Sequence, residues 1–123
     1  MTKQSLVSII DDDESVRESL PDLLREMGFS ADAFSSAEDF LASSSIAQTR
    51  CLILDIAMPG MSGPDLQHAL TLLQRKIPIV FITAHEDDNI RQYVLRQGAV
   101  ECLLKPFSDA ALLAALKTAL RVN

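Results

Sequence analysis

Short apolar runs of the sequence end at residues whose side chains can do chemistry. An acidic cluster, Asp11 to Glu14, follows the first run, and Asp55, Thr83 and Lys105 each follow a later one. In an open α/β sheet, ligands bind outside the carboxyl ends of the strands. If the runs are parallel strands, we expect these side chains to meet at one edge of the sheet.

Such a meeting favours phosphoryl chemistry beside a metal ion. Crowded carboxylates raise one another's pKa unless a cation neutralises them. Mg²⁺ suits this set because it accepts one or two carboxylates with waters and phosphate oxygens, whereas a Ca²⁺ cage needs more protein oxygens. We expect Asp55, beside the ion, to be the phosphoryl acceptor. Lys105 could contact one phosphoryl oxygen as a point charge, and the Thr83 hydroxyl could donate to another.

Each of these residues also has a purely structural explanation. Acids after a strand often cap the following helix, which would account for Asp11 to Glu14. Asp55 could start a turn, Thr83 could cap a helix, and Lys105 could be a solvated loop charge. These explanations treat the residues one at a time, and they leave the shared position at the strand ends unexplained.

The elements that must position these residues follow from the hydrophobic pattern. Apolar runs of strand length alternate with stretches of helical period, which is typical of repeated βα units. The expected strands are 6–10, 29–34, 51–54, 79–82 and 100–104. Five βα units in this length predict an α/β fold with an open, doubly wound parallel sheet.

Caps and apolar stripes mark five expected helices. The first bends at Pro21 and ends at Gly28, and Ser36 caps a short second helix over 37–41, followed by a loop at 43–45. Boundaries of the last three are signalled by Pro64, Asp87 or Asp88, Gly98 and Ser108. Their apolar stripes are Leu66, Leu70 and Leu73; Ile90, Tyr93, Val94 and Leu95; and Leu112, Leu113, Leu116 and Leu120.

Composition limits the classes of protein that the chain can represent. Its 123 residues, 48% hydrophobic, fit one domain over 1–123 with a core at about 5–121. A net charge of −6 argues against direct nucleic-acid binding. Neither a signal peptide nor an apolar run of ~20 residues is present, so we expect no membrane contact and a cytoplasmic location. Cys51 and Cys102 are expected to be buried free thiols.

Together, these motifs resemble the receiver domain of bacterial two-component response regulators over essentially the whole chain. The matching segments are residues 9–17, 54–63, 82–85 and 104–107. The loop at 58–63 looks most like regulators of the nitrogen-fixation type. The resemblance implies a flavodoxin-like fold, a five-stranded parallel sheet of order 2-1-3-4-5 with five helices.

The resemblance also assigns roles residue by residue. Asp55 would accept the phosphoryl group, while Asp11, Asp12, Asp55 and the backbone carbonyl of Ala57 would bind Mg²⁺, with Asp13 outside the ligand set. Thr83 and Lys105 would contact the phosphoryl oxygens. Small Ala84 would keep that group accessible, and the Lys105–Pro106 bond would be cis.

The partners follow from the same resemblance. A sensor histidine kinase or a small phosphodonor would supply the phosphoryl group, and the domain would act as a signalling phosphoacceptor rather than as an enzyme. Phosphorylation could drive a homodimer through the fourth helix and fifth strand. A DNA-binding effector domain would lie outside this chain.

One position departs from the family pattern. Receivers commonly carry a Tyr or Phe three residues before the lysine, where the ring turns inward as the threonine moves toward the phosphate, and this chain has Cys102 there. The signal would then depend on backbone movement of the 83–88 loop and on the face built from the fourth helix and fifth strand.

Two other functions fit part of the pattern. Haloacid-dehalogenase-type phosphatases also follow a first strand with Asp-x-Asp, which Asp11 and Asp13 satisfy. Such enzymes need a further acidic metal motif after the lysine, where this chain has residues 106–109, Pro-Phe-Ser-Asp. A passive binding module would require that Asp55 never be modified.

Overall fold

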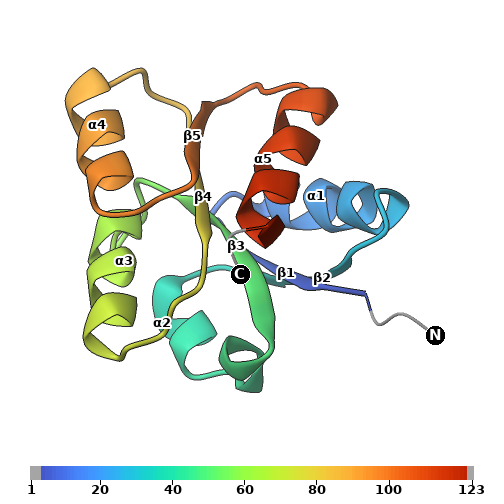
Figure 1. The fold of residues 1–123 in the computed structure, drawn as a ribbon, viewed down its shortest axis with the longest axis horizontal. Helices are drawn as coiled ribbons and strands as arrows, with labels where there is room; N and C mark the ends of the chain where they lie inside the picture. Colours follow the sequence, from blue (N-terminus) through green and yellow to red (C-terminus); the bar gives the residue numbers. More distant parts are fainter. Residues whose placement is uncertain (1–3, 122–123) are drawn as a thin grey trace.

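The computed structural model describes residues 4–121 and contains a five-stranded parallel sheet of order β2-β1-β3-β4-β5 (Figure 1). The strands are β1 (Leu6–Ile10), β2 (Ser30–Phe34), β3 (Thr49–Asp55), β4 (Ile79–Thr83) and β5 (Glu101–Leu104). Every neighbouring pair is parallel. The doubly wound sheet and its flavodoxin-like order are therefore confirmed.

A helix follows each strand and returns the chain to the edge where the strands begin. The helices are α1 (Glu14–Glu26), α2 (Ala37–Leu41), α3 (Gly63–Leu72), α4 (Asp88–Arg96) and α5 (Asp109–Arg121). Because strands and helices alternate in direction, helices start at the edge where strands end, here called the carboxyl edge. They end at the opposite, amino edge. No helix within residues 4–121 is both long and apolar enough to span a bilayer.

The helices cover both faces of the sheet (Figure 1). One apolar cluster joins α1 and α5 to the sheet, with Leu24 and Leu116 fully buried, and a second joins α2, α3 and α4 to the other face. In β3, Ile53 belongs to the first cluster while Leu52 and Leu54 belong to the second. The central strand is thus apolar on both sides, as parallel strands covered by helices must be.

Side chains cap the helix starts at the carboxyl edge. Asp13 accepts from the Ser15 amide at the start of α1, and Ser36 accepts from the Asp39 amide at the start of α2. The remaining caps are Ser62 for α3, Asp87 for α4 and Ser108 for α5. The structural explanation for an acid after the first strand is therefore correct for Asp13.

Three helices end at the amino edge in the same backbone turn. In each, the residue after the cap is left-handed and the next amide donates back into the last helical turn. The left-handed residue is Gly28 after α1 and Gly98 after α4, at φ values of 99° and 106°. After α3 it is Gln74, at φ 57°, although glycine adopts this conformation at the least cost.

Several local predictions need correction. β3 starts at Thr49 rather than at residue 51, because Thr49 already pairs with Leu6 of β1, and its hydroxyl also bonds the buried Ser8 hydroxyl at 2.7 Å. The predicted loop at 43–45 is partly wrong, since Ser44–Ala47 form a 3₁₀ turn closed by a bond from the Gln48 amide to the Ser45 carbonyl. Leu73, expected in the core, is 57% exposed because α3 ends there.

α1 continues without a break through the buried Pro21. The bend expected at this residue stays a prediction. The last strand begins at Glu101, one residue later than expected, and Val94 is the fully buried member of the predicted α4 stripe. Tyr93 on the same helix is 45% exposed, so it belongs to the surface and not to the core.

Candidate functional site

Three carboxylates meet at the carboxyl edge. Asp11 and Asp12 follow β1, and Asp55 is the last residue of β3, which pairs directly with β1. One oxygen from each of the three side chains lies within 4.8 Å of the others. Asp11 and Asp55 are buried, whereas Asp12 is exposed. The parallel pairing of β1 and β3 thus explains why residues 44 positions apart in the sequence share one small site.

Asp11 is held in place by contacts on both of its carboxylate oxygens. Lys105 Nζ donates to Oδ2 at 2.7 Å, and the Asp13 amide donates to Oδ1 at 2.9 Å. Its backbone carbonyl accepts from Arg17 Nη1 at 3.0 Å. Since Asp11 has no exposed surface, these donors compensate for burial of its charge.

Lys105 reaches the site from the end of β5. Its backbone amide donates to the Thr83 carbonyl at 2.7 Å, which ties the ends of β4 and β5 together. The Lys105–Pro106 peptide bond is cis, as the family resemblance predicted. The lysine therefore places a positive charge beside Asp11 and also favours the charged form of Asp55.

The negative charges around Asp55 are only partly neutralised by nearby positive charge. Burial, followed by the negative charge of Asp11, raises the pKa of Asp55 to about 7, and Lys105 only partly opposes this rise. A divalent cation among these oxygens would relieve both effects. The donor set, which consists of carboxylates and includes one exposed member, fits a hard cation such as Mg²⁺.

Thr83 and Ala57 line one wall of the neighbouring space. The Thr83 hydroxyl donates to the His85 carbonyl at 3.2 Å and accepts from the His85 amide at 3.1 Å. Thr83 and Ala57 both line a cavity of about 530 Å³ that extends to Cys102. Burial raises the pKa of the Cys102 thiol, whose residue is only 8% exposed.

The loop between β3 and α3 depends on two contacts that sequence reasoning missed. A Cβ atom on Gly63 would lie 2.4 Å from the Asp55 carbonyl oxygen, so α3 can start this close to β3 only with glycine. Glu38 of α2 accepts from the Met61 amide at 3.2 Å. Arg17 was likewise given no role. No local signal marks these residues, because each acts on a segment distant in the sequence or through its backbone.

All the expected site residues thus lie at the carboxyl edge, on the loops and strand ends that the topology brings together. A family model described as the response regulator receiver domain matches residues 7–117. The chain belongs to the response regulator receiver domains. This receiver domain is therefore a signalling domain of two-component systems, and the family match does not support the phosphatase alternative.

Relatives and solved structures agree with this assignment. The response regulator protein TodT of Pseudomonas putida is 42% identical over 120 residues, which are 98% of this chain and 53% of TodT. The structure of the response regulator StyR is 46% identical with a TM-score of 0.90, over 98% of this chain and 61% of that one. FixJ-N is 36% identical with a TM-score of 0.86, over 98% and 96%. The receiver domain spans about half the length of the curated relatives it matches.

Proposed function

We propose that this receiver domain takes a phosphoryl group onto Asp55, with Mg²⁺ bound by Asp11, Asp12, Asp55 and the Ala57 carbonyl. The observation that carries the proposal is the meeting of three carboxylates within 4.8 Å beside the Lys105 ammonium group. In the reaction, an Asp55 oxygen forms a bond to phosphorus while the bond from phosphorus to the donor breaks. The donor is a phosphohistidine of a sensor kinase or a small phosphodonor.

The residues around Asp55 supply positioning and charge. The Lys105 ammonium group is held 2.7 Å from Asp11 and would lie next to a phosphoryl oxygen, whose negative charge it would stabilise. The Thr83 hydroxyl would exchange its bonds to the His85 backbone for a phosphoryl oxygen. When bound, the metal ion neutralises negative charge on the phosphoryl oxygens. None of these roles needs a general base, so the chain acts as a phosphoacceptor and not as an enzyme that turns over other substrates.

Phosphorylation would bias the domain between two conformations. The aspartyl phosphate adds charge and acceptor oxygens, and it shifts the balance only by bonding differently to the two forms. Thr83 is the residue whose bonds can change between those forms. Because its loop and Cys102 border the same cavity, the change would pass to α4 and β5 without an aromatic ring.

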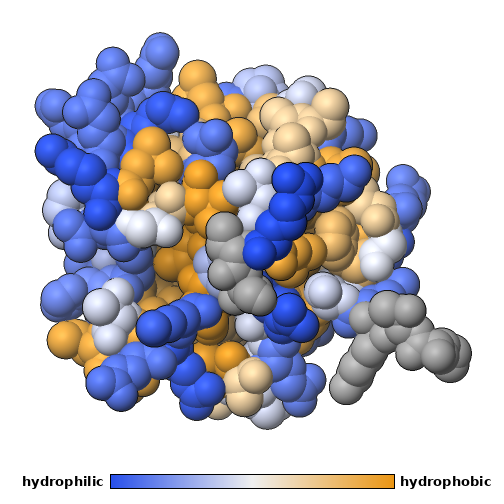
Figure 2. Space-filling model, in the orientation of Figure 1, coloured by the Kyte–Doolittle hydropathy of each residue, from blue (hydrophilic) through white to orange (hydrophobic). Residues whose placement is uncertain are grey.

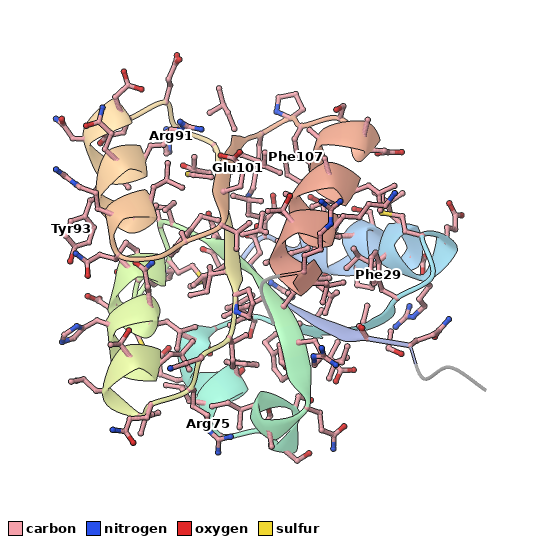
Figure 3. The ribbon with its side chains drawn as sticks, in the orientation of Figure 1. Phe29, Arg75, Arg91, Tyr93, Glu101 and Phe107 are labelled. Carbon is pink, nitrogen blue, oxygen red and sulfur yellow. The ribbon has the colours of Figure 1, made fainter. Side chains whose placement is uncertain are left out.

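The face built from α4 and β5 suits a phosphorylation-dependent homodimer. Tyr93 and Leu104 are each 45% exposed there, and Arg91 pairs with Glu101 at 2.9 Å across the two elements (Figure 3). Hydrophobic residues, orange in Figure 2, also reach the surface between α4 and α5. Since an exposed apolar surface rimmed by charge is typical of association, we infer that the active form pairs through this face.

The remaining proposals concern the whole protein. We infer that residues 1–123 form a single receiver domain and that a DNA-binding effector domain lies outside it. The length of the relatives supports a further region, because the matching segment is 53% of TodT, and the name of FixJ as a transcriptional regulatory protein supports DNA binding by that region. Two free cysteines are consistent with the cytoplasm, a reducing compartment.

A phosphorylation assay tests the central proposal. The chain is incubated with Mg²⁺ and acetyl phosphate, and intact-mass spectrometry then detects a base-labile phosphoryl adduct. We expect the adduct on the wild type, its loss in Asp55→Asn, and its loss when EDTA removes the metal. Asp88→Asn, an exposed carboxylate on α4, is the matched control and keeps the adduct. An adduct that persists in Asp55→Asn shows that the acceptor is another residue.

A further inference from the structure

A second open space lies at the amino edge, away from the phosphorylation site. It is a groove of about 930 Å³ between the end of α3, the turn before β4 and the turn after α4. Its lining includes the half-buried apolar residues Ile77, Pro78 and Val100. The volume is in the upper part of the range for small-molecule pockets, roughly 300–1,000 Å³. The groove is therefore large enough for an organic molecule of nucleotide size.

A buried amide lies behind the lining of this groove. Gln67 of α3 is 5% exposed, and its Nε2 donates to the Val94 carbonyl of α4 at 3.0 Å. Gln67 Oε1 has no hydrogen-bond partner among residues 4–121. Because the donor bond fixes the orientation of the amide, the oxygen cannot be satisfied by turning the group over. Because less than 1 Å² of this oxygen is exposed, a ligand in the groove does not contact it, and Gln67 contributes only to the shape of the wall.

The charges around the groove have one sign. Arg75 and Lys76 line it, and its lining residues include no Asp or Glu. Within the described part of the chain, neither cation forms an ion pair. Figure 3 labels Arg75 at the lower end of the molecule, in the segment from α3 to β4. In a chain of net charge −6, this is a local surface that attracts anions.

The helix-ending turn after α3 also departs from its two counterparts. Gln74 keeps a side chain in the left-handed position where α1 and α4 have glycine. Gln74 lines the groove, and so does Gly98 from the equivalent turn of α4. The side chain at residue 74 therefore adds a polar amide to the wall at a conformational cost that glycine would avoid.

We propose that this groove binds a nucleotide-sized organic anion that carries an apolar ring. The anionic group contacts Arg75 and Lys76, and the ring lies on the apolar part of the lining. This site is separate from Asp55 and does not depend on phosphorylation.

Adenosine 5′-monophosphate is the test probe, because it combines a phosphate with a flat ring. It is titrated into the ¹⁵N-labelled receiver domain without Mg²⁺, so that metal cannot bridge it to the carboxyl edge. We expect saturable shifts of amides around residues 67–79 and 97–100 with a Kd of about 1 mM. Adenosine, which lacks the anion, should bind about tenfold more weakly.

Variants that leave the fold intact separate the groove from general charge effects. Arg75→Gln and Lys76→Gln remove exposed cations and should each weaken binding about threefold to tenfold. Lys117→Gln removes an exposed cation from α5, outside the groove, and should leave binding unchanged. Shifts confined to the carboxyl edge, equal effects of all three variants, or no saturable shift at about 10 mM probe would each overturn the proposal.

Discussion

The two edges of the sheet differ in charge and in the way their helix ends are completed. At the carboxyl edge, Asp11 and Asp55 are buried beside one lysine, and side chains such as Asp13 cap the helix starts. At the amino edge, the groove has two cations and no acid among its lining residues, and backbone amides complete the turns after α1, α3 and α4.

This difference shows that a parallel βα repeat makes its two edges chemically unequal. Helix N-termini carry partial positive charge and free N–H groups, so the carboxyl edge tolerates carboxylates and a phosphoryl group. Helix C-termini carry partial negative charge, so cations such as Arg75 and Lys76 are favoured just after α3. Particular residues then add a site to each edge. Three substitutions test how far the two edges really differ.

The largest effect is expected from Gly63→Ala at the carboxyl edge. The added methyl group would lie 2.4 Å from the Asp55 carbonyl oxygen and 2.9 Å from the Phe81 ring, where neighbouring backbone cannot easily move. We expect the free energy of unfolding, measured in urea, to fall by roughly 3 kcal/mol. Gly28→Ala is the control, because nothing lies within 4 Å of its added Cβ and only the positive φ is unfavourable. Equal losses would refute the steric argument.

A smaller effect with opposite sign is expected from Asp55→Asn in metal-free buffer. Since the pKa of Asp55 is raised to about 7, the folded state binds more protons than the unfolded state between about pH 4 and pH 7. Wild-type stability therefore falls as pH rises through this window. The uncharged variant should match the wild type near pH 4 and exceed its free energy of unfolding by about 2 kcal/mol at pH 8.

Two controls sharpen this test of the buried charges. Glu18→Gln makes the same chemical change on the exposed side of α1 and should show no such pH dependence. Mg²⁺ should raise the melting temperature of the wild type at pH 8 much more than that of Asp55→Asn, because a deprotonated carboxylate is the better ligand. A gain from Asp55→Asn that is the same at pH 4 and pH 8 would contradict the charge explanation.

The smallest effect is expected at the amino edge, from Gln74→Gly. Glycine relieves the left-handed backbone at φ 57° but adds flexibility to the unfolded chain. We expect a net gain in the free energy of unfolding of about 0.5 kcal/mol. The reciprocal change, Gly98→Gln in the equivalent turn of α4, should cost about 1 kcal/mol. If both substitutions destabilise, the two turns are not equivalent, and the Gln74 side chain has a structural role.

The hydrophobic pattern of the sequence predicted most of the fold. Strand-length runs such as 79–82 and turn signals such as Gly28 and Gly98 are local, and local sterics and burial determine what they form. The errors lie where a tertiary contact decides the outcome. Thr49 joins β3 because it pairs with Leu6 of the adjacent strand β1, and Leu73 is exposed because α3 ends at that residue.

The sequence by itself determined which residues could do chemistry, because parallel strands must end at one edge and bring Asp11, Asp12 and Asp55 together. Tertiary structure alone decided how they behave. The pairing of Lys105 with Asp11 spans 94 residues, and the burial that raises the pKa of Asp55 exists only in the folded chain. The amino-edge groove and its unpartnered Gln67 oxygen have no sequence signature, since they arise from the distances between packed elements.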